Sequence, residues 1–226
     1  MAALDQISKP LVAGEKLSRE EFMRRWELMP NVKRAELIGG IVYVASPLSI
    51  AHGSQDNLVG WWLRFYSIHT PGCEAANNTT WYMLEDAPQP DVYLRILPEY
   101  GGQSGVAAGK YGAGAPELAV EVSLASASRD RGPKLDLYRQ AGVQEYVTVR
   151  IEKPNLVWRR LETGAYHELR PDADGFLRSV VFPGLWLDPQ ALLAQDGARL
   201  LEVLKQGLAS PEHEEFVRIL ARRRTK

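Results

Sequence analysis

Two short stretches of the sequence decide its fold: residues 91–97, DVYLRIL, and residues 117–123, ELAVEVS. In both stretches apolar and polar side chains alternate, as they do on a β-strand, where successive side chains point to opposite faces. The apolar faces consist of Val92, Leu94 and Ile96, and of Leu118, Val120 and Val122. The other faces carry Asp91, Tyr93 and Arg95, and Glu117, Ala119, Glu121 and Ser123. If the strands pair, Asp91 and Glu121 lie together on the non-core face of one sheet.

The segments around these strands predict helices and further strands. Residues 17–29 begin with a capping box of Ser18 and Glu21, which predicts a helix, and residues 35–45 predict a β-hairpin around Gly39 and Gly40. We also expect helices at 50–69, 133–141, 189–207 and 211–223, and strands at 79–84, 145–151, 155–161 and 165–170. The glycine-rich residues 100–115 read as a mobile loop. This order predicts an α/β (α+β) fold, a mixed sheet flanked by helices.

Composition excludes several classes of protein. The chain has 226 residues, of which 45% are hydrophobic and 24% charged, which is typical of a globular protein with one decorated domain or two very small ones. No apolar stretch reaches the length of a membrane span and the first residues lack a signal-peptide pattern, so we expect a cytoplasmic protein. Cys73 is the only cysteine, which excludes an intramolecular disulfide and a cysteine-rich zinc site. The formal net charge of −1 argues against a non-specific DNA coat.

The two acidic residues raise the question of a metal site. A carboxylate deep within a strand, as at Glu121, is costly unless it is paired or bound to a cation. Two carboxylates about 4 Å apart repel by roughly 4 kcal/mol at an effective dielectric constant of 20. A hard cation such as Mg²⁺, which prefers oxygen ligands, would convert that cost into binding. The alternatives are that Asp91, which follows Pro90, is a turn residue and that Glu121 is a salt-bridged strand residue.

Other candidates lie on neighbouring elements. Lys134 and Tyr138 are four residues apart on the expected helix 133–141, so they share a face, and Lys134 could orient or help to deprotonate a water. His52 and Gln55 share the first turn of helix 50–69, and Glu36 opens the hairpin. Each also has a simpler interpretation: a solvated lysine, a capping or packing histidine, and a surface acid.

A series of short motifs resembles a known family. The motifs are ELIGG at 36–40, SP at 46–47, AHG at 51–53, PDV at 90–92, PELAVEVS at 116–123, the stretch from Lys134 to Tyr138, AGVQEY at 141–146, and FPGL at 182–185 with Leu187. In this order they resemble the Uma-type "putative restriction endonuclease" family of the PD-(D/E)XK nuclease superfamily. The resemblance covers about residues 17–195, which suggests an N-terminal extension at 1–16, a nuclease domain at 17–195 and a C-terminal helical extension at 196–226.

The resemblance implies a restriction-endonuclease-like mixed sheet and an endonuclease that uses Mg²⁺ (or Mn²⁺) to hydrolyse DNA. Asp91 and Glu121 would bind the metal, with the carbonyl of Val122 as a further ligand, and Lys134 would complete the catalytic set. Glu36, as an outer ligand, and His52, Gln55 and Tyr138 would support them.

The sequence departs from the family pattern in two places. The superfamily carries a lysine two residues after the second acid, where this chain has Ser123, so the resemblance assigns that lysine to Lys134 on the next helix. The family's Ser-Pro-Ser is replaced by SLASAS at 123–128. The loop before the lysine helix is therefore expected to differ in shape.

The nuclease hypothesis carries further expectations. Arg95, Arg129 and Arg131 are candidate contacts to the DNA backbone, since phosphate contacts position a duplex without reading its sequence. Cutting two strands suggests a homodimer, and the strand pair 145–161 with Trp158 is one possible dimer surface. The alternative from another class is a catalytically silent interaction protein of the same fold, which the near-neutral charge and the lost Ser-Pro-Ser favour. A nuclease for RNA or branched nucleic acid stays open, as does a nucleic-acid contact by the arginines at 222–224.

Overall fold

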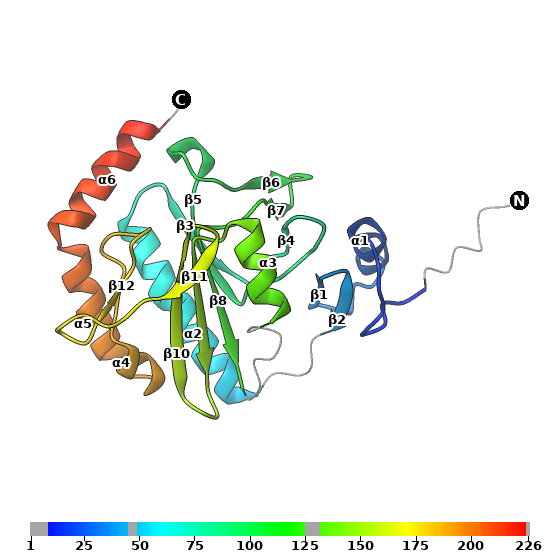
Figure 1. Cartoon of the computed structure of the whole chain (residues 1–226), viewed down its shortest axis with the longest axis horizontal. Helices are drawn as coiled ribbons and strands as arrows, with labels where there is room; N and C mark the ends of the chain where they lie inside the picture. The colour runs from blue at the N-terminus through cyan, green and yellow to red at the C-terminus, as the bar shows by residue number, and fades with distance from the viewer. Residues whose placement is uncertain (1–8, 45–48, 125–131, 225–226) are drawn as a thin grey trace, which may run out of the picture.

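The centre of the protein is a six-stranded mixed sheet in the order β11-β10-β9-β8-β5-β3 (Figure 1). The computed structural model describes residues 9–44, 49–124 and 132–224. The strands are β3 (Cys73–Asn77), β5 (Val92–Ile96), β8 (Leu118–Ser123), β9 (Glu145–Arg150), β10 (Asn155–Glu162) and β11 (Ala165–Glu168). β8 and β9 are parallel, whereas all other neighbours in this sheet are antiparallel. The expectation of one mixed sheet is confirmed.

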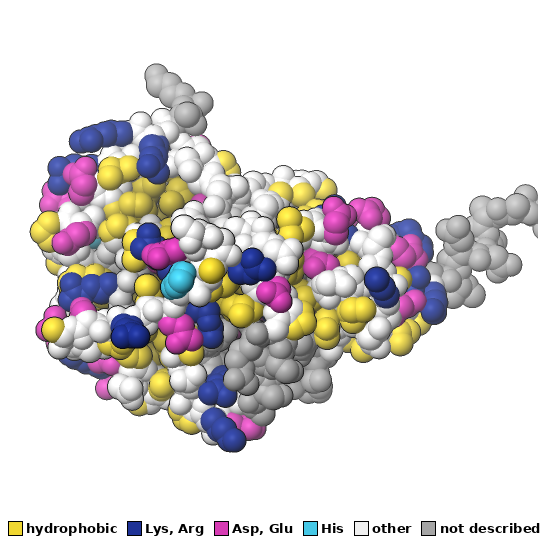
Figure 2. All heavy atoms as spheres, in the orientation of Figure 1, with side chains coloured by type: hydrophobic (Ala, Val, Ile, Leu, Met, Phe, Trp, Pro, Cys, Tyr) yellow, Lys and Arg dark blue, Asp and Glu magenta, His cyan; other side chains and the backbone are white. Residues whose placement is uncertain are grey.

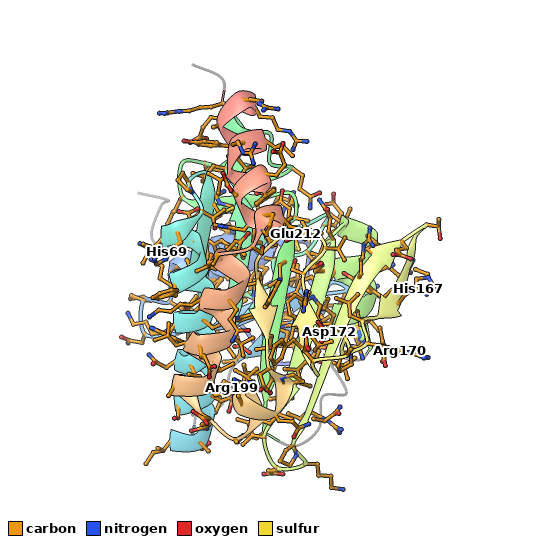
Figure 3. The ribbon with its side chains drawn as sticks, turned by 90° about the vertical axis from the view of Figure 1, so that its left-hand side faces the viewer. His69, His167, Arg170, Asp172, Arg199 and Glu212 are labelled. Carbon is orange, nitrogen blue, oxygen red and sulfur yellow. The ribbon has the colours of Figure 1, made fainter. Side chains whose placement is uncertain are left out.

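Helices cover one face of this sheet. α2 (Ile50–His69) lies against β3, β5 and β8. Three more helices lie on the same side of the sheet: α4 (Pro189–Leu193), α5 (Gly197–Leu208) and α6 (Pro211–Arg223) (Figure 3). The aliphatic faces of β5 and β8 pack here with Trp62 and Leu63 of α2. α2 occupies the predicted range and is capped by Ser49, whose side chain accepts a hydrogen bond from the His52 amide. The side chains buried on this face of the sheet make up most of the hydrophobic core.

The opposite face of the sheet is also buried, so the prediction of a non-core face is wrong. Tyr93 of β5 and Ala119 of β8 pack with Leu137 and Tyr138 of α3 (Pro133–Ala141) and with Ile38. Ile38 belongs to the hairpin of β1 (Ala35–Ile38) and β2 (Ile41–Val44), which α1 (Arg19–Glu27) precedes at the right-hand end of Figure 1. The central strands are covered on both sides, as is typical where helices flank a sheet.

The glycine-rich residues 100–115 form ordered elements, which corrects the prediction of a mobile loop. They contain the end of a 3₁₀ turn (η1, Pro98–Tyr100) and two strands, β6 (Gly105–Ala107) and β7 (Tyr111–Ala113), which join β4 (Trp81–Tyr82) in a three-stranded sheet. At Gly112 a Cβ would lie 2.3 Å from the Trp81 ring, and at Gly102 it would lie 1.8 Å from the Ile96 carbonyl oxygen. These glycines therefore permit close packing instead of mobility.

Two further expectations need correction near the C-terminal part of the sheet. The expected helix 189–207 is two helices, because Gln195 adopts a left-handed backbone (φ +57°) and the Asp196 side chain caps α5. Trp158 is 1% exposed and packs edge-on against Trp62, and its Nε1 donates to Glu145 Oε2 at 3.2 Å. It therefore cannot form a dimer surface. A short pair, β12 (Leu177–Arg178) and β13 (Trp186–Leu187), was not predicted.

The surface mixes charges of both signs. On the face shown in Figure 2, Lys and Arg side chains alternate with Asp and Glu instead of forming one basic area. Cys73 is partly buried against the core. Among the helices of the described residues, none combines the length and the apolar character needed to cross a bilayer.

Candidate active site

Strand pairing brings the two acidic residues of the decisive stretches together. β5 and β8 are antiparallel with Val92 opposite Val120, so the next pair in the same register is Asp91 and Glu121. Both side chains are buried, with 3% and 4% exposed. Oδ2 of Asp91 accepts a hydrogen bond from the Val122 amide at 2.8 Å, which fixes the Asp91 side chain against β8. The expected juxtaposition of these two carboxylates is therefore present.

A buried lysine links two of the acids. Lys134 Nζ lies 2.8 Å from Glu121 Oε2 and 2.8 Å from Glu36 Oε1, and the lysine is 4% exposed. Glu36 Oε1 also accepts a hydrogen bond from the Gln89 amide at 2.8 Å. Neither the solvated-lysine nor the surface-acid interpretation holds. The first turn of α3 and the start of the hairpin thus meet at Glu121.

Tyr138 completes the contacts of Glu121. Its hydroxyl donates to Glu121 Oε1 at 2.7 Å, one helical turn after Lys134 on the same face of α3. Burial, and then the negative charge of Glu121, raise the pKa of Tyr138 well above its usual value. Tyr138 is therefore a neutral donor at neutral pH. Its spacing from Lys134 had predicted that the two side chains share a face of this helix.

Two charged residues of the site were missed from the sequence. Arg34, just before β1, places a guanidinium nitrogen 2.5 Å from Asp91 Oδ1. Burial by itself would lower the pKa of Arg34, but Asp91, Glu36 and Glu121 outweigh it and raise that pKa. Asp56 lies on α2, where burial and then the charge of Asp91 raise its pKa to about 6. Its position four residues after His52, on the same face of the helix, could have indicated it.

Of the two supporting residues on α2, the structure brings one to the site. His52 Nε2 lies 2.8 Å from the carbonyl oxygen of Val122, which can only accept, so Nε2 carries the proton. Gln55 instead donates to the Leu192 carbonyl at 3.0 Å and accepts from Gln195 Nε2 at 3.2 Å. Gln55 therefore ties α2 to the α4 region, and the expectation that it supports the acids is wrong.

The other histidines lie elsewhere. His69 on α2 and His167 on β11 are exposed (Figure 3). His213 is buried on α6, with Nε2 2.9 Å from the Thr70 hydroxyl. His52 is therefore the histidine that this site can use.

Of the three arginines expected to contact DNA, the structure describes Arg95. Arg95 donates to Glu74 Oε2 at 2.6 Å, lies over the Trp81 ring, and has only 11% of its side chain exposed. A buried, ion-paired guanidinium is not available to a DNA backbone, so this expectation is corrected. Arg129 and Arg131 lie outside the described residues, as do Ser46, Pro47 and most of the SLASAS segment.

The donor set suits a hard cation. Asp91, Glu121 and the Val122 carbonyl offer oxygen ligands, and Mg²⁺ commonly uses one or two protein carboxylates and keeps several waters. The described part of the chain holds no group of three or more His, Cys, Asp or Glu side chains arranged to bind a metal. Charge at the pair is balanced by Arg34 on Asp91 and by Lys134 on Glu121. The ligand chemistry fits Mg²⁺, with these two side chains as neighbouring cations.

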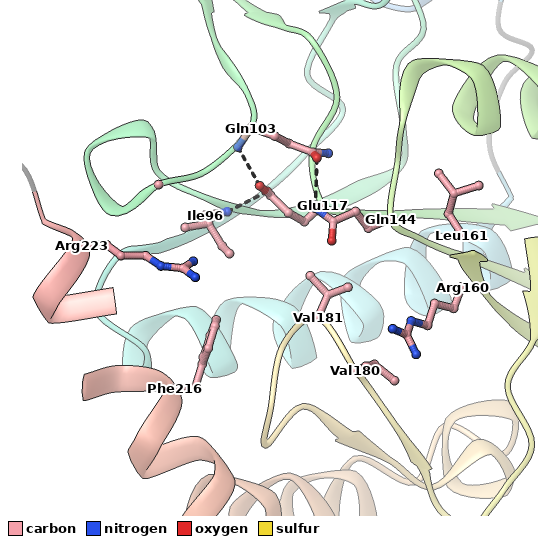
Figure 4. A pocket seen from close by; sticks show the side chains of 11 residues that line it. Ile96, Gln103, Glu117, Gln144, Arg160, Leu161, Val180, Val181, Phe216 and Arg223 are labelled. Atoms are coloured by element: carbon pink, nitrogen blue, oxygen red, sulfur yellow. Dashed lines mark hydrogen bonds between the residues drawn. The ribbon is translucent and has the colours of Figure 1, made fainter. Parts of the chain in front are cut away.

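A cavity of about 330 Å³ lies near the other end of β8 (Figure 4). Glu117 lines it and accepts hydrogen bonds from the amides of Ile96 at 2.8 Å and Gln103 at 2.9 Å. Burial raises the pKa of Glu117. Because Glu117 precedes Glu121 by four strand residues, the two carboxylates are roughly 13 Å apart along β8. The cavity is therefore separate from the carboxylate pair, and Glu117 anchors the 96–103 turn.

The fold is a mixed sheet flanked by helices, with two acids brought together at β5 and β8. Residues 19–190 match the family model Uma2, described as "Putative restriction endonuclease". The chain belongs to this Uma2 family, which confirms the resemblance seen in its motifs.

A solved structure shares the fold. It is a crystal structure described as "a putative nuclease belonging to DUF820" from Anabaena variabilis ATCC 29413. It is 14% identical, with a TM-score of 0.60, and the match covers 79% of this chain and 98% of that one. No curated protein matches the chain. At this identity the likeness bears on the fold alone.

Proposed function

We propose that the protein is a Mg²⁺-dependent endonuclease that hydrolyses DNA phosphodiester bonds at the Asp91–Glu121 pair. One observation carries the proposal: a buried carboxylate directly before β5 continues the register opposite a buried carboxylate on β8, and a buried lysine contacts the second one. Buried like charges are costly, so a fold that keeps them together has a use for their combined charge. The Uma2 family's description as "Putative restriction endonuclease" supports DNA as the substrate.

Asp91, Glu121 and the Val122 carbonyl are the groups that would hold the metal. A bound Mg²⁺ supplies a Lewis acid for the phosphoryl oxygen and lowers the pKa of a bound water. Asp91 is held in place by the Val122 amide, and Glu121 by the Tyr138 hydroxyl. Both contacts fix carboxylate orientation before substrate arrives, which avoids reorganisation during the reaction.

Lys134 provides the fixed positive charge of the site. Glu36 and Glu121 hold its ammonium group between them, so the group cannot leave to bulk water. There it stabilises the negative charge that develops on the phosphate during hydrolysis. His52 donates to the Val122 carbonyl and thereby aligns this part of β8. Cutting both strands of a duplex would take two copies of the chain.

Plasmid nicking tests this proposal. Supercoiled plasmid is incubated with wild type, Glu121→Gln and a control variant, Glu168→Gln, in Mg²⁺, Mn²⁺ or EDTA. Glu168 is a surface carboxylate on β11 of the same sheet, 66% exposed. We expect nicking by wild type and the control only with metal, and a loss of about 100-fold or more in Glu121→Gln.

Two outcomes would reject the proposal. Equal nicking by wild type and Glu121→Gln would remove the site assignment. A wild type that neither nicks nor melts at a higher temperature with either cation would favour the silent interaction protein.

A further inference from the structure

Arg34 contacts the proposed metal-binding carboxylate directly. Its guanidinium lies 2.5 Å from Asp91 Oδ1, while Oδ2 of the same carboxylate accepts the Val122 amide. Oδ1 is therefore the oxygen of Asp91 that a metal would take from Arg34. The role of Arg34 follows from the proposed function, because it depends on Asp91 being a metal ligand.

A divalent ion and a guanidinium compete at this oxygen. Arginine stays protonated at any pH at which proteins are folded, so its charge cannot be relieved by deprotonation. Like charges a few ångströms apart in a partly buried site repel strongly, because the effective dielectric constant is low. Metal binding to Asp91 therefore favours a position of Arg34 away from Oδ1.

The two cations of the site differ in freedom of movement. Lys134 is held by two acids and has 4% of its side chain exposed. Arg34 has 23% of its side chain exposed and lies in the segment between α1 and β1, outside any strand. Arg34 can therefore turn towards solvent, and towards a bound substrate, while Lys134 stays in place.

We propose that Arg34 is an internal competitor of the divalent metal at Asp91 and that, once displaced, it positions the substrate by binding a DNA phosphate. The planar guanidinium binds phosphate oxygens in a bidentate manner, which suits it to this second position. Metal binding and DNA binding are then coupled through the Arg34 side chain, because metal binding at Asp91 frees the guanidinium to bind a DNA phosphate.

Calcium binding and DNA binding together test the proposal. Ca²⁺ prefers the same oxygen ligands, and its affinity is measured by isothermal titration for wild type, Arg34→Gln, Arg34→Lys and Asp91→Asn. Arg24→Gln is the matched control, since Arg24 is an exposed arginine paired with Glu21 on α1. We expect Arg34→Gln to bind Ca²⁺ about tenfold more tightly than wild type. The control should equal wild type, and Asp91→Asn should lose binding.

The DNA measurement has the opposite expected sign. In saturating Ca²⁺, Arg34→Gln should bind a fluorescein-labelled DNA duplex about tenfold more weakly than wild type in fluorescence anisotropy. A merely structural role would weaken both interactions, so a gain of metal affinity with a loss of DNA affinity identifies the competition.

Other results would overturn it. Equal or weaker Ca²⁺ binding by Arg34→Gln, with binding lost in Asp91→Asn, rejects the competition and leaves the metal site standing. Absence of Ca²⁺ binding in every variant rejects the metal site as well. If Arg34→Gln does not fold, Arg34→Lys is the deciding variant. The lysine ammonium lacks the planar guanidinium and should compete less well for Asp91, so we expect an intermediate gain in Ca²⁺ affinity. No gain in Ca²⁺ affinity would contradict the proposal.

Discussion

Replacing Lys134 by methionine should destabilise the protein strongly. The substitution keeps an unbranched side chain, one atom shorter, but removes the cation that lies 2.8 Å from both Glu36 and Glu121. Two carboxylates, with 14% and 4% of their side chains exposed, then lack the cation that balances them. Removing one partner of a buried ion pair costs about 3–5 kcal/mol, because the remaining charge is buried without compensation.

Urea unfolding followed by circular dichroism, in EDTA, measures this loss. In a thermal melt of a chain of this size, the same loss of 3–5 kcal/mol in the free energy of unfolding would lower the melting temperature by roughly 6–20 °C. The added substitution Glu121→Gln should recover part of the loss at pH 7.

Lys110→Met is the matched control for this prediction. Lys110 pairs with Glu27 at 3.3 Å, and the two side chains are 61% and 49% exposed. Exposed pairs contribute about 0–1 kcal/mol, so this variant should stay close to wild type. A loss below about 1 kcal/mol in Lys134→Met would refute the reasoning that Lys134 neutralises buried acids.

Three further outcomes are expected. The pKa of Asp56 is raised from 3.8 to about 6, so its contribution to stability is present below pH 3.8 and is lost as the pH rises through about 6. Asp56→Asn should therefore gain about 1–2 kcal/mol relative to wild type between pH 4 and pH 7.5 in urea titrations, after a discount for solvent screening; a constant difference would contradict this. Trp158→Ala should lose about 3–5 kcal/mol in thermal melts because it empties a core position, and a loss typical of a surface residue would contradict the buried placement. Gly102→Ala should unfold at markedly lower urea, since its Cβ would overlap the Ile96 carbonyl, whereas Gly53→Ala on α2 should gain about 0.5–1 kcal/mol; equal midpoints would contradict the packing described.

Local patterns in the sequence were sufficient for much of the fold. Side-chain alternation located β5 and β8, and their register confirmed that Asp91 and Glu121 are neighbours. The capping box located α1, because the hydroxyl of Ser18 accepts a helix amide as the pattern predicts. These features depend on contacts within a few residues, which a single sequence displays.

Tertiary contacts account for what the sequence did not show. The burial of both sheet faces depends on where α3 and the β1–β2 hairpin pack, which alternation within one strand does not reveal. Arg34 carries no local sign of its contact with Asp91, 57 residues later. Gln55 and His52 share a helical turn, yet only the structure shows that the first bonds to the α4 region and the second to β8.

The most direct test of the proposed site is the position of a bound metal. Crystals of the wild type grown or soaked with Mn²⁺ are measured near the manganese absorption edge, and anomalous difference density locates the ion. We predict a peak about 2.0–2.3 Å from carboxylate oxygens of both Asp91 and Glu121, with the Arg34 guanidinium moved away from Asp91. A Mn²⁺ peak that contacts neither carboxylate, or no peak at saturating Mn²⁺, would contradict the assignment of this pair as the metal-binding centre.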